Sequence, residues 1–328
     1  MVKVSVLMAC YNSERWVAQA IMSVLSQSYK NFEFVIVDDG STDGTRAILK
    51  RFARVDKRIR IIISAHSGLT RALNKGLEIC VGTWISRIDA DDLWSVDKLK
   101  LQLQLVEKLD NVILIGSWCS IIDEEGGEQK VVRYPLQSKR LKKNLICAKR
   151  FFPHSSAMFK RRVGNVSVYY DQQYIKSQDY ELWLRLLSLG EFACVNKSLV
   201  GLRVHRDQVS YSPNGVKQYA YMVCARTALE LQKYSGTRGS CEVVGDSDVF
   251  VKWVLRQFQD DPQSVKFDSI KGAEIRKSLT GNVFIGRIRF VLDLVRRRAL
   301  LYYLMNRWCG NRLPKKYAKR WRGMRCAA

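Results

Sequence analysis

The sequence predicts an α/β fold in which a Rossmann-like, mostly parallel sheet is flanked by helices and followed by a basic helical extension. Short apolar runs alternate with helical patterns four times in succession, and each run is apolar throughout, as in strands buried on both faces. After Pro213 the strand-like runs give way to basic amphipathic patterns. With 328 residues, 47% of them hydrophobic, the chain can form one full domain and an appendage.

The four strand–helix units follow one another directly. We expect strands at 4–9, 32–37, 59–63 and 83–88, followed in turn by helices at 13–27, 42–53, 69–79 and 96–109. Further strands are expected at 112–122, 130–134, 192–195 and 199–204, with a helix at 178–189. These elements predict one domain over residues 1–212 and a basic helical extension over 213–328. Such sheets bind ligands at the carboxyl ends of their strands.

Composition limits the partners and the compartment. The net charge of +24 favours a polyanionic partner, which could be nucleic acid, anionic lipid headgroups or a phosphorylated substrate. The nine cysteines are scattered without a CxxC pair, which indicates reduced thiols rather than a disulfide framework or a zinc site. We see no signal-peptide pattern and no apolar stretch of the roughly 20 residues that a spanning helix needs. We therefore expect a cytoplasmic protein, soluble or bound to a membrane face.

Acidic residues follow two of the predicted strands. Asp38 and Asp39 end the second strand, where a carboxylate can accept from the imide of a uracil or from ribose hydroxyls. The simpler alternative is a turn with a helix cap, which we favour for Thr42 and Asp43.

The fourth strand delivers a run of acids, Asp89-Ala90-Asp91-Asp92, to the same edge. In a strand of period two, Asp89 and Asp91 point the same way, so two hard oxygen ligands converge. Mg²⁺ or Mn²⁺ binds few protein carboxylates and takes its other ligands from water and substrate phosphates. The run therefore predicts a site for a metal ion that binds a diphosphate, and the alternative is a solvated acidic loop that caps the next helix.

These motifs carry a family resemblance. Residues 4–12, 23–29, 35–43 and 88–92 resemble, in order and spacing, the successive blocks of family 2 glycosyltransferases with the GT-A fold, and the similarity extends to about residue 210. The resemblance implies a catalytic domain over 1–212, with a nucleotide-sugar half at about 1–110 and an acceptor half at about 111–212. It implies bacterial-type polysaccharide or lipopolysaccharide synthesis.

The resemblance also implies roles for single residues on the donor side. Tyr11 would lie beside the nucleotide base, Asp39 would accept from the uracil with Asp38 next to it, and Arg71 would lie near the sugar-diphosphate. Asp89 and Asp91 would form the DxD element, with Asp91 as the direct ligand of Mn²⁺ or Mg²⁺.

The catalytic base is expected at the start of the helix at 178–189. Asp179 resembles the family's aspartate that removes the proton from the acceptor hydroxyl, and unsatisfied amides at a helix N-terminus can hold a carboxylate ionised. Gln178 replaces the first acid often seen in that block, so the base is Asp179, with Glu181 as substitute. The alternative is an ordinary helix cap.

Two further blocks complete the expected site. Arg203 and His205 resemble the family's closing block, in which the arginine and histidine approach the metal-diphosphate, so His205 is a candidate metal ligand. His154 lies in a segment that resembles the acceptor side, and we assign it no chemical step.

The expected function is inverting, metal-dependent transfer of a sugar from a nucleotide-sugar, most simply a UDP-sugar, to a hydroxyl of a glycan or lipid-linked glycan. From Gly286 onward one acid, Asp293, faces many Lys and Arg residues with interleaved Trp and Tyr, which predicts binding to an anionic membrane surface from the cytoplasmic side. The alternative is a helical cap on the catalytic domain. A sugar nucleotidyltransferase and a nucleic-acid-binding protein stay as alternative functions, although we expect no nucleic-acid partner.

Overall fold

The structure is a computed structural model that describes residues 3–205, 218, 221–229, 252, 314, 315, 317 and 318. It divides into two compact units. The first comprises residues 1–143, 151–182 and 189–204, and the second comprises 144–150, 183–188 and 205–328. The predicted boundary at 212 and the basic segment after Gly286, apart from four positions between 314 and 318, lie outside the described residues.

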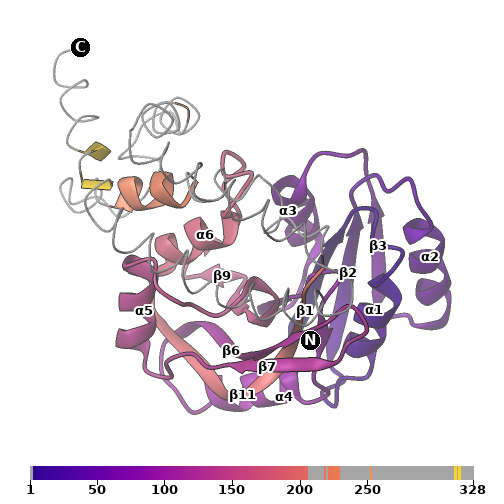
Figure 1. The fold of residues 1–328 in the computed structure, drawn as a ribbon, viewed down its shortest axis with the longest axis horizontal. Helices are drawn as coiled ribbons and strands as arrows, with labels where there is room; N and C mark the ends of the chain where they lie inside the picture. The colour runs from indigo at the N-terminus through magenta and orange to yellow at the C-terminus, as the bar shows by residue number, and fades with distance from the viewer. Residues whose placement is uncertain are drawn as a thin grey trace, which may run out of the picture. The chain divides into compact units, whose positions relative to one another are not determined.

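The first unit contains the predicted parallel strands. Within the described residues, nine strands form one sheet, and its first half has the order β3-β2-β1-β4. These strands are β1 (Val4–Cys10), β2 (Phe32–Asp38), β3 (Ile59–Ile63) and β4 (Trp84–Arg87). Their pairings with one another are all parallel. Every residue of β1, β2 and β4 is buried, which confirms the interpretation of these three apolar runs as strands covered on both faces (Figure 1). It is wrong for β3, the edge strand, in which only Ile59 is buried.

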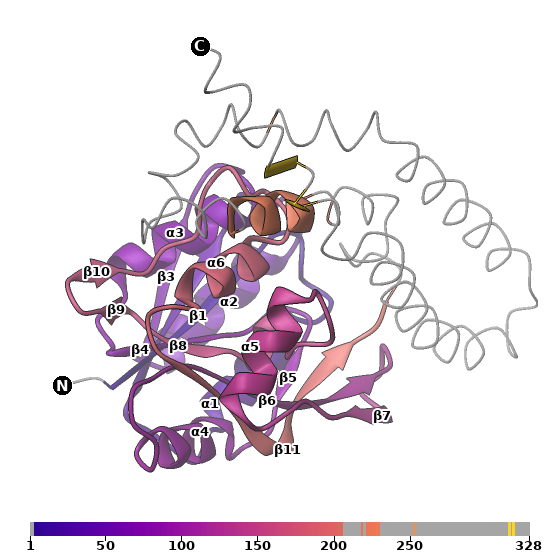
Figure 2. The same cartoon turned by 90° about the vertical axis from the view of Figure 1, so that its left-hand side faces the viewer.

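The second half of the sheet is mixed. β8 (Met158–Lys160) pairs antiparallel with both β4 and β6 (Val112–Ile122), and so joins the two halves. β6 is flanked by β7 (Glu128–Val132) and β11 (Glu191–Arg203), which lie along it in Figure 2. The strand β5 (Leu93–Trp94) pairs with β11.

The prediction of two strands at 192–195 and 199–204 is wrong. Both segments belong to β11, whose register against β6 shifts on each side of Ser198. The exposed polar residues Asn196 and Lys197 suggested a loop, but they lie in a bulge that leaves the strand continuous.

Four helices follow the first four strands as predicted: α1 (Val17–Leu25), α2 (Thr45–Val55), α3 (Leu69–Ile79) and α4 (Lys98–Val106). α3 has the predicted bounds, α1 and α4 are shorter than predicted, and α2 begins and ends later in the chain. Figure 1 shows α3 on one side of the parallel strands and α1 and α2 on the other. α6 (Gln178–Leu186) also starts where predicted. The sequence prediction missed α5 (Ser138–Ile146), the 3-10 turn η1 (His154–Ser156) and the small hairpin of β9 (Arg162–Val163) and β10 (Val166–Ser167).

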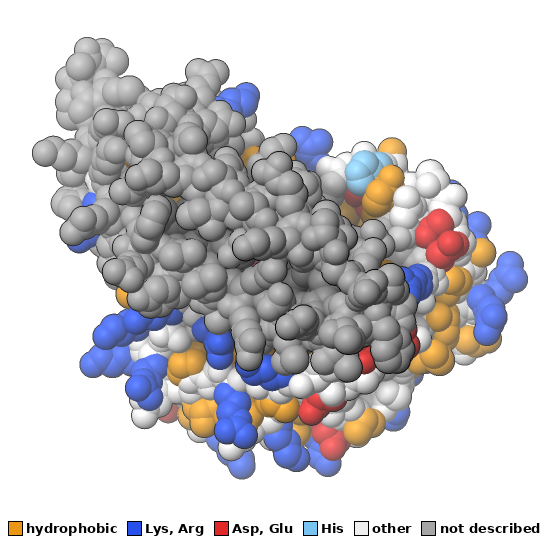
Figure 3. All heavy atoms as spheres, in the orientation of Figure 1, with side chains coloured by type: hydrophobic (Ala, Val, Ile, Leu, Met, Phe, Trp, Pro, Cys, Tyr) orange, Lys and Arg blue, Asp and Glu red, His pale blue; other side chains and the backbone are white. Residues whose placement is uncertain are grey.

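Basic side chains gather on one helix of the described surface. Lys139, Arg140 and Lys143 of α5 are exposed, and Figure 3 shows Lys and Arg side chains clustered where Figure 1 draws this helix. Among the described helices, none combines the length and the apolar character that crossing a bilayer requires.

The turn before β4 approaches β1 closely at Gly82. Its amide donates to the Ser5 hydroxyl at 2.8 Å, and a Cβ at this position would lie 2.5 Å from the Ser5 amide nitrogen and 2.7 Å from the Val4 carbonyl carbon. Because these are backbone atoms of a central strand, they cannot move aside without disturbing the pairing of β1 with β4. The absence of a side chain at residue 82 is therefore a condition for this pairing.

We predict that Gly82→Ala lowers the free energy of unfolding by about 1–3 kcal/mol, because the added methyl group forces a backbone shift. Denaturant titration would measure it. Val81→Ala is the matched control, since Val81 is exposed and its substitution should change stability by less than about 0.5 kcal/mol. Equal stability of both variants would contradict this account, because it would mean that the turn accommodates the added methyl group without a backbone shift.

Candidate active site

The two acid-bearing turns leave the sheet on either side of β1. The Asp39 amide donates to the Cys10 carbonyl at 2.9 Å, and the Ile88 amide donates to the Leu7 carbonyl at 3.1 Å. Parallel hydrogen bonding thus continues past the ends of β2 and β4. The predicted meeting of these turns at one edge of the sheet is what the structure shows.

Asp38 is an internal support of its turn. Its carboxylate has no exposed surface, accepts from the Ser41 amide at 2.9 Å and forms an ion pair with Arg46 at 3.0 Å. The predicted contact of Asp38 with a nucleotide stays a prediction; in the structure this carboxylate shapes the loop that carries Asp39.

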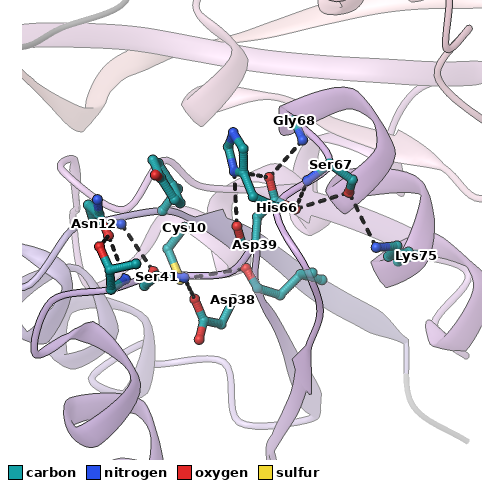
Figure 4. A network of polar contacts seen from close by, with 12 residues as sticks. Cys10, Asn12, Asp38, Asp39, Ser41, His66, Ser67, Gly68 and Lys75 are labelled. Atoms are coloured by element: carbon teal, nitrogen blue, oxygen red, sulfur yellow. Dashed lines mark hydrogen bonds and ion pairs between the residues drawn. The ribbon is translucent and has the colours of Figure 1, made fainter.

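Asp39 holds the loop that precedes α3. One carboxylate oxygen accepts from the Ser67 amide at 2.9 Å and the Ser67 hydroxyl at 3.0 Å, and the other accepts from the Gly68 amide at 2.8 Å. His66 adds Nδ1, which lies 3.0 Å from the Asp39 carbonyl and 3.1 Å from the second carboxylate oxygen. Figure 4 shows these residues gathered around Asp39, with Lys75 behind Ser67.

An aromatic pair lies over this loop. The rings of Tyr11 and His66 have centroids 4.2 Å apart with a tilt of 34°. Tyr11 is 45% exposed, which is unusual for an aromatic residue beside a buried strand. The two rings together offer an exposed planar surface next to the buried Asp39 carboxylate.

Asp89 is oriented by a buried arginine and a serine. Arg87, 1% exposed, forms an ion pair with the Asp89 carboxylate. The Ser155 hydroxyl donates to the same carboxylate at 2.9 Å and accepts from the Asp89 amide, also at 2.9 Å. Ser155 is part of η1, and its carbonyl accepts from the Trp94 indole at 2.9 Å. The position of Asp89 is therefore set by a chain segment more than 60 residues away in sequence.

Arg203 forms hydrogen bonds with the other two acids of the turn, Asp91 and Asp92. Its guanidinium is buried and donates to the Asp91 carbonyl at 2.8 Å, to the carbonyls of Asp123 and Glu124, and to Gln19. The Arg203 amide donates to the Asp92 carboxylate at 2.9 Å. Arg203 thus holds the backbone of Asp91 and the carboxylate of Asp92 in place, and its predicted approach to the metal-diphosphate stays a prediction.

The acidic turn suits a metal ion that brings its own ligands. Among the described residues, no three His, Cys, Asp or Glu side chains are arranged as a metal site. Asp89 and Asp91 are partly exposed, whereas Asp92 is buried, and burial together with the charges of Asp91 and Asp89 holds the pKa of the Asp92 carboxyl well above its usual value. Two accessible carboxylates fit Mg²⁺ or Mn²⁺ when phosphate oxygens and water complete the coordination.

Asp179 lies in the first turn of α6, as predicted, and belongs to the same unit as the acidic turn. The residue is only partly covered, but its carboxyl lies deep among other groups, and this burial raises its pKa. The Tyr180 amide and the charge of Arg87 lower the pKa in part, while the charge of Asp89 raises it further. Asp179 is thus within electrostatic reach of the Arg87–Asp89 pair.

The segment before α6 is tied to α3. The Asn74 side chain donates to the Tyr170 carbonyl at 2.8 Å and accepts from the Tyr170 amide at 2.9 Å. The Thr70 hydroxyl donates to the Tyr174 carbonyl at 2.9 Å. Since the loop that begins α3 is bound to Asp39, α3 connects the Asp39 side of the site with the segment that leads to Asp179.

Three other predicted site residues, His154, Arg71 and His205, differ in how far they are buried. His154 is buried, with Nε2 2.8 Å from the Tyr170 hydroxyl, and burial, aided by the charge of Arg87, lowers its pKa well below the usual value, so it is a neutral support. Arg71 is exposed in the first turn of α3. His205 is buried and belongs to the second unit. Their predicted ligand contacts stay predictions.

Sequence reasoning missed three residues that the structure brings to the site: Arg87, Ser155 and His66. Arg87 had a signal, because a charged residue interrupts an otherwise apolar strand directly before the acids. His66 follows the third strand at the same sheet edge, which also could have identified it. Ser155 had no local signal, since its contact with Asp89 exists only in the folded chain.

Comparison with known proteins is consistent with this geometry. The model of "Glycosyl transferase family 2" matches residues 5–165. An uncharacterized glycosyltransferase of Methanocaldococcus jannaschii is 31% identical over 226 residues, which cover 66% of this chain and 77% of that protein. The UDP-Glc:alpha-D-GlcNAc-diphosphoundecaprenol beta-1,3-glucosyltransferase WfgD of Escherichia coli is 27% identical over 224 residues, covering 66% and 81%.

Solved structures share the fold. S. aureus TarS 1–349 in complex with UDP superposes with a TM-score of 0.53 at 14% identity, covering 84% of this chain and 89% of that one. The mannosyltransferase PcManGT of Pyrobaculum calidifontis, in complex with GDP-Man and Mn²⁺, has a TM-score of 0.53 at 17% identity and covers 97% and 86%. At these identities the likeness concerns the fold, which is that of GT-A glycosyltransferases.

We predict that Arg203→Lys lowers the free energy of unfolding by about 2–4 kcal/mol, because one ammonium cannot satisfy the buried carbonyls of Asp91, Asp123 and Glu124 together. Denaturant titration would measure the change. Arg15→Lys is the matched control: Arg15 pairs with Glu124 at the surface, so its change should stay below about 1 kcal/mol. A tolerated Arg203→Lys would mean that the acidic turn does not depend on the guanidinium fork.

Proposed function

Because this chain belongs to glycosyltransferase family 2, we propose that it transfers a sugar from a UDP-sugar to a hydroxyl group of a glycan or lipid-linked glycan, with inversion at the anomeric carbon. One observation carries this proposal. The Asp179 carboxyl, in the first turn of α6 and in the same unit as the acidic turn, lies within electrostatic reach of the Asp89–Arg87 pair. A base and a diphosphate site so arranged suit a single in-line displacement.

The donor binds at the carboxyl edge of β1, β2 and β4. Tyr11 and the loop held by Asp39 line the nucleotide side, and Asp89 lies at the sugar-diphosphate side. Arg71, exposed in the first turn of α3, would contact a phosphate of the donor, and Arg203 holds the backbone of the acidic turn. UDP is the proposed nucleotide because WfgD is named for UDP-Glc and TarS is solved with UDP.

Asp91, supported by Asp89, would hold Mn²⁺ or Mg²⁺. The ion supplies Lewis-acid stabilisation of the negative charge that develops on the departing nucleoside diphosphate. PcManGT, which shares the fold, is solved with Mn²⁺. Buried Arg87 forms an ion pair with the Asp89 carboxylate and so helps to fix its position.

Asp179 acts as the general base. Its raised pKa brings it closer to the pH at which a base both stays ionised and accepts a proton readily. The acceptor hydroxyl gives its proton to Asp179 while its oxygen attacks the anomeric carbon, so one displacement inverts that centre. His154 and Tyr170 support the acceptor side without a chemical step.

The acceptor belongs to cell-surface polysaccharide synthesis in this proposal, because WfgD is named for a diphosphoundecaprenol-linked acceptor. A lipid-linked acceptor favours a peripheral position on the inner face of the cytoplasmic membrane. The exposed Lys139, Arg140 and Lys143 add positive charge in the described residues, and the basic segment after Gly286 would add more. Family membership disfavours the nucleotidyltransferase and nucleic-acid-binding alternatives.

We predict that Asp179→Asn lowers kcat by about 10²–10⁴-fold while UDP binding is retained, because the amide cannot accept the proton. Steady-state kinetics and calorimetry would separate the two effects. In the native enzyme the acidic limb of kcat/KM should lie above the pH of an ordinary aspartate, since activity falls as Asp179 becomes protonated at its raised pKa. Glu181→Gln tests the alternative base. If Asp179→Asn kept full activity and Glu181→Gln were inactive, Glu181 rather than Asp179 would be the general base.

We predict that Mn²⁺ binds at least about tenfold more tightly in the presence of UDP, because two accessible carboxylates need the diphosphate oxygens to complete the ion's coordination. Calorimetric titration with and without UDP would measure this coupling. Asp91→Ala should abolish it, while Asp97→Ala, which removes a carboxylate just before α4, should preserve it. Tight Mn²⁺ binding without nucleotide would contradict this view of the site.

A further inference from the structure

Lys98, the first residue of α4, is a buried lysine that the proposed chemistry does not use. Its side chain has no exposed surface, and Nζ donates to the Ser86 hydroxyl at 2.8 Å and to the side-chain oxygen of Gln102 at 2.9 Å. In the described part of the chain no carboxylate pairs with this amine, so burial alone lowers the pKa of Lys98 well below its usual value. An apolar side chain would fill the same space with a smaller desolvation penalty, so packing does not explain a lysine at this position.

Gln102 links Lys98 to the 3-10 turn η1. The side-chain nitrogen of Gln102 donates to the Ser156 carbonyl at 2.8 Å. Because a carbonyl only accepts hydrogen bonds, the amide nitrogen has to face Ser156 and the amide oxygen faces Lys98. The hydrogen bond from Lys98 therefore holds the Gln102 amide in the orientation that binds η1.

Trp94 forms a second link between Lys98 and η1. Nζ of Lys98 lies over the Trp94 ring, 3.8 Å from its centroid, and the indole N–H at the edge of that ring donates to the Ser155 carbonyl at 2.9 Å. Contact with the ring face limits how far the indole can tilt, so it keeps the N–H directed at η1. The carbonyls of two consecutive residues of η1 are thus held by two side chains that both contact Lys98.

The turn held in this way orients Asp89. The Ser155 hydroxyl donates to the Asp89 carboxylate and accepts from the Asp89 amide, both at 2.9 Å. These two hydrogen bonds need the Ser155 side chain in one position relative to the acidic turn, and that position follows from the backbone of η1. The contacts therefore run without interruption from Lys98 to a carboxylate of the proposed metal-diphosphate site.

We propose that Lys98 is a positioning residue for this site: through η1 it holds the Asp89 carboxylate in the orientation that a divalent ion bound to a diphosphate needs. Lys98 lies too deep to touch the ion or the donor, so it acts only through Gln102, Trp94 and Ser155. Groups that orient metal ligands in this way affect metal affinity almost as strongly as the ligands do. The inference rests on the proposed function, since it concerns the acidic turn that would hold the ion.

Calorimetric titration of the full-length protein with Mn²⁺, with and without UDP, tests the inference. Lys98→Met keeps the length of the side chain and loses the donors, so it should weaken Mn²⁺ binding in the presence of UDP by about tenfold and change UDP binding without metal by less than about twofold. Leu103→Ala is the matched control. It removes a buried side chain of the same helix that forms none of these hydrogen bonds, and it should keep the native Mn²⁺ affinity within about twofold.

Hydrogen–deuterium exchange gives a second readout that needs no metal. In Lys98→Met the amides of residues 87–92 and 153–157 should exchange at least about fivefold faster than in the native protein, while those of β2 keep their native rates. Trp94→Phe keeps an aromatic ring next to Lys98 and loses only the N–H that binds Ser155. It should show the same local change to a smaller extent, and it tests the inference even if Lys98→Met folds poorly.

Native Mn²⁺ affinity together with native exchange rates in Lys98→Met, or in Trp94→Phe if Lys98→Met does not fold, would overturn the inference. An equal loss of Mn²⁺ affinity in Leu103→Ala would also overturn it, because any loosening of α4 would then have the same effect. If UDP did not strengthen Mn²⁺ binding to the native protein, the proposed metal site would fail. The exchange rates around Asp89 would still decide whether Lys98 positions that residue.

Discussion

The site depends on the parallel pairing of β1 with β2 on one side and β4 on the other. Backbone hydrogen bonds from Asp39 to Cys10 and from Ile88 to Leu7 extend this pairing into the turns that follow. The two acidic turns therefore leave the same edge at a separation set by the strands. A slip of one residue in either strand would turn its side chains to the other face of the sheet, Asp38 of β2 and Arg87 of β4 among them, and would so displace the residues of the site.

Neutral polar groups then connect the two halves of the domain without cancelling the charges that ligands need. Ser155, from the segment before β8, forms hydrogen bonds that orient Asp89. The side chain of Asn74, in α3, forms two hydrogen bonds with the backbone of Tyr170, in the segment that precedes α6. Hydroxyl and amide groups can fix a carboxylate or a chain segment and leave the net charge of the site unchanged. Arg87 is the exception, because its buried guanidinium carries a positive charge that pairs with Asp89 and also acts on Asp179.

The sequence predicts the parts of this fold whose signals are local. The four strand–helix units and the acids at the ends of β2 and β4 follow from apolar runs and their boundaries. Pairing across long sequence distances is not encoded locally, so β8 and the contact of Ser155 with Asp89 could not be found. α5 was missed because its buried residues, Leu141 and Leu145, lie within a basic run, and the roles of Asp39 and His66 depend on a loop geometry that no spacing rule gives.

The central claim is a single displacement on a UDP-sugar, with Asp179 and the acidic turn acting on the same anomeric carbon. Its most direct test is nuclear magnetic resonance of the reaction with a UDP-sugar of defined configuration, followed from the first turnover. Release of UDP together with a glycoside of the opposite anomeric configuration is expected. Retained configuration, or release of UMP with transfer of a sugar phosphate to the acceptor, would contradict the proposed mechanism.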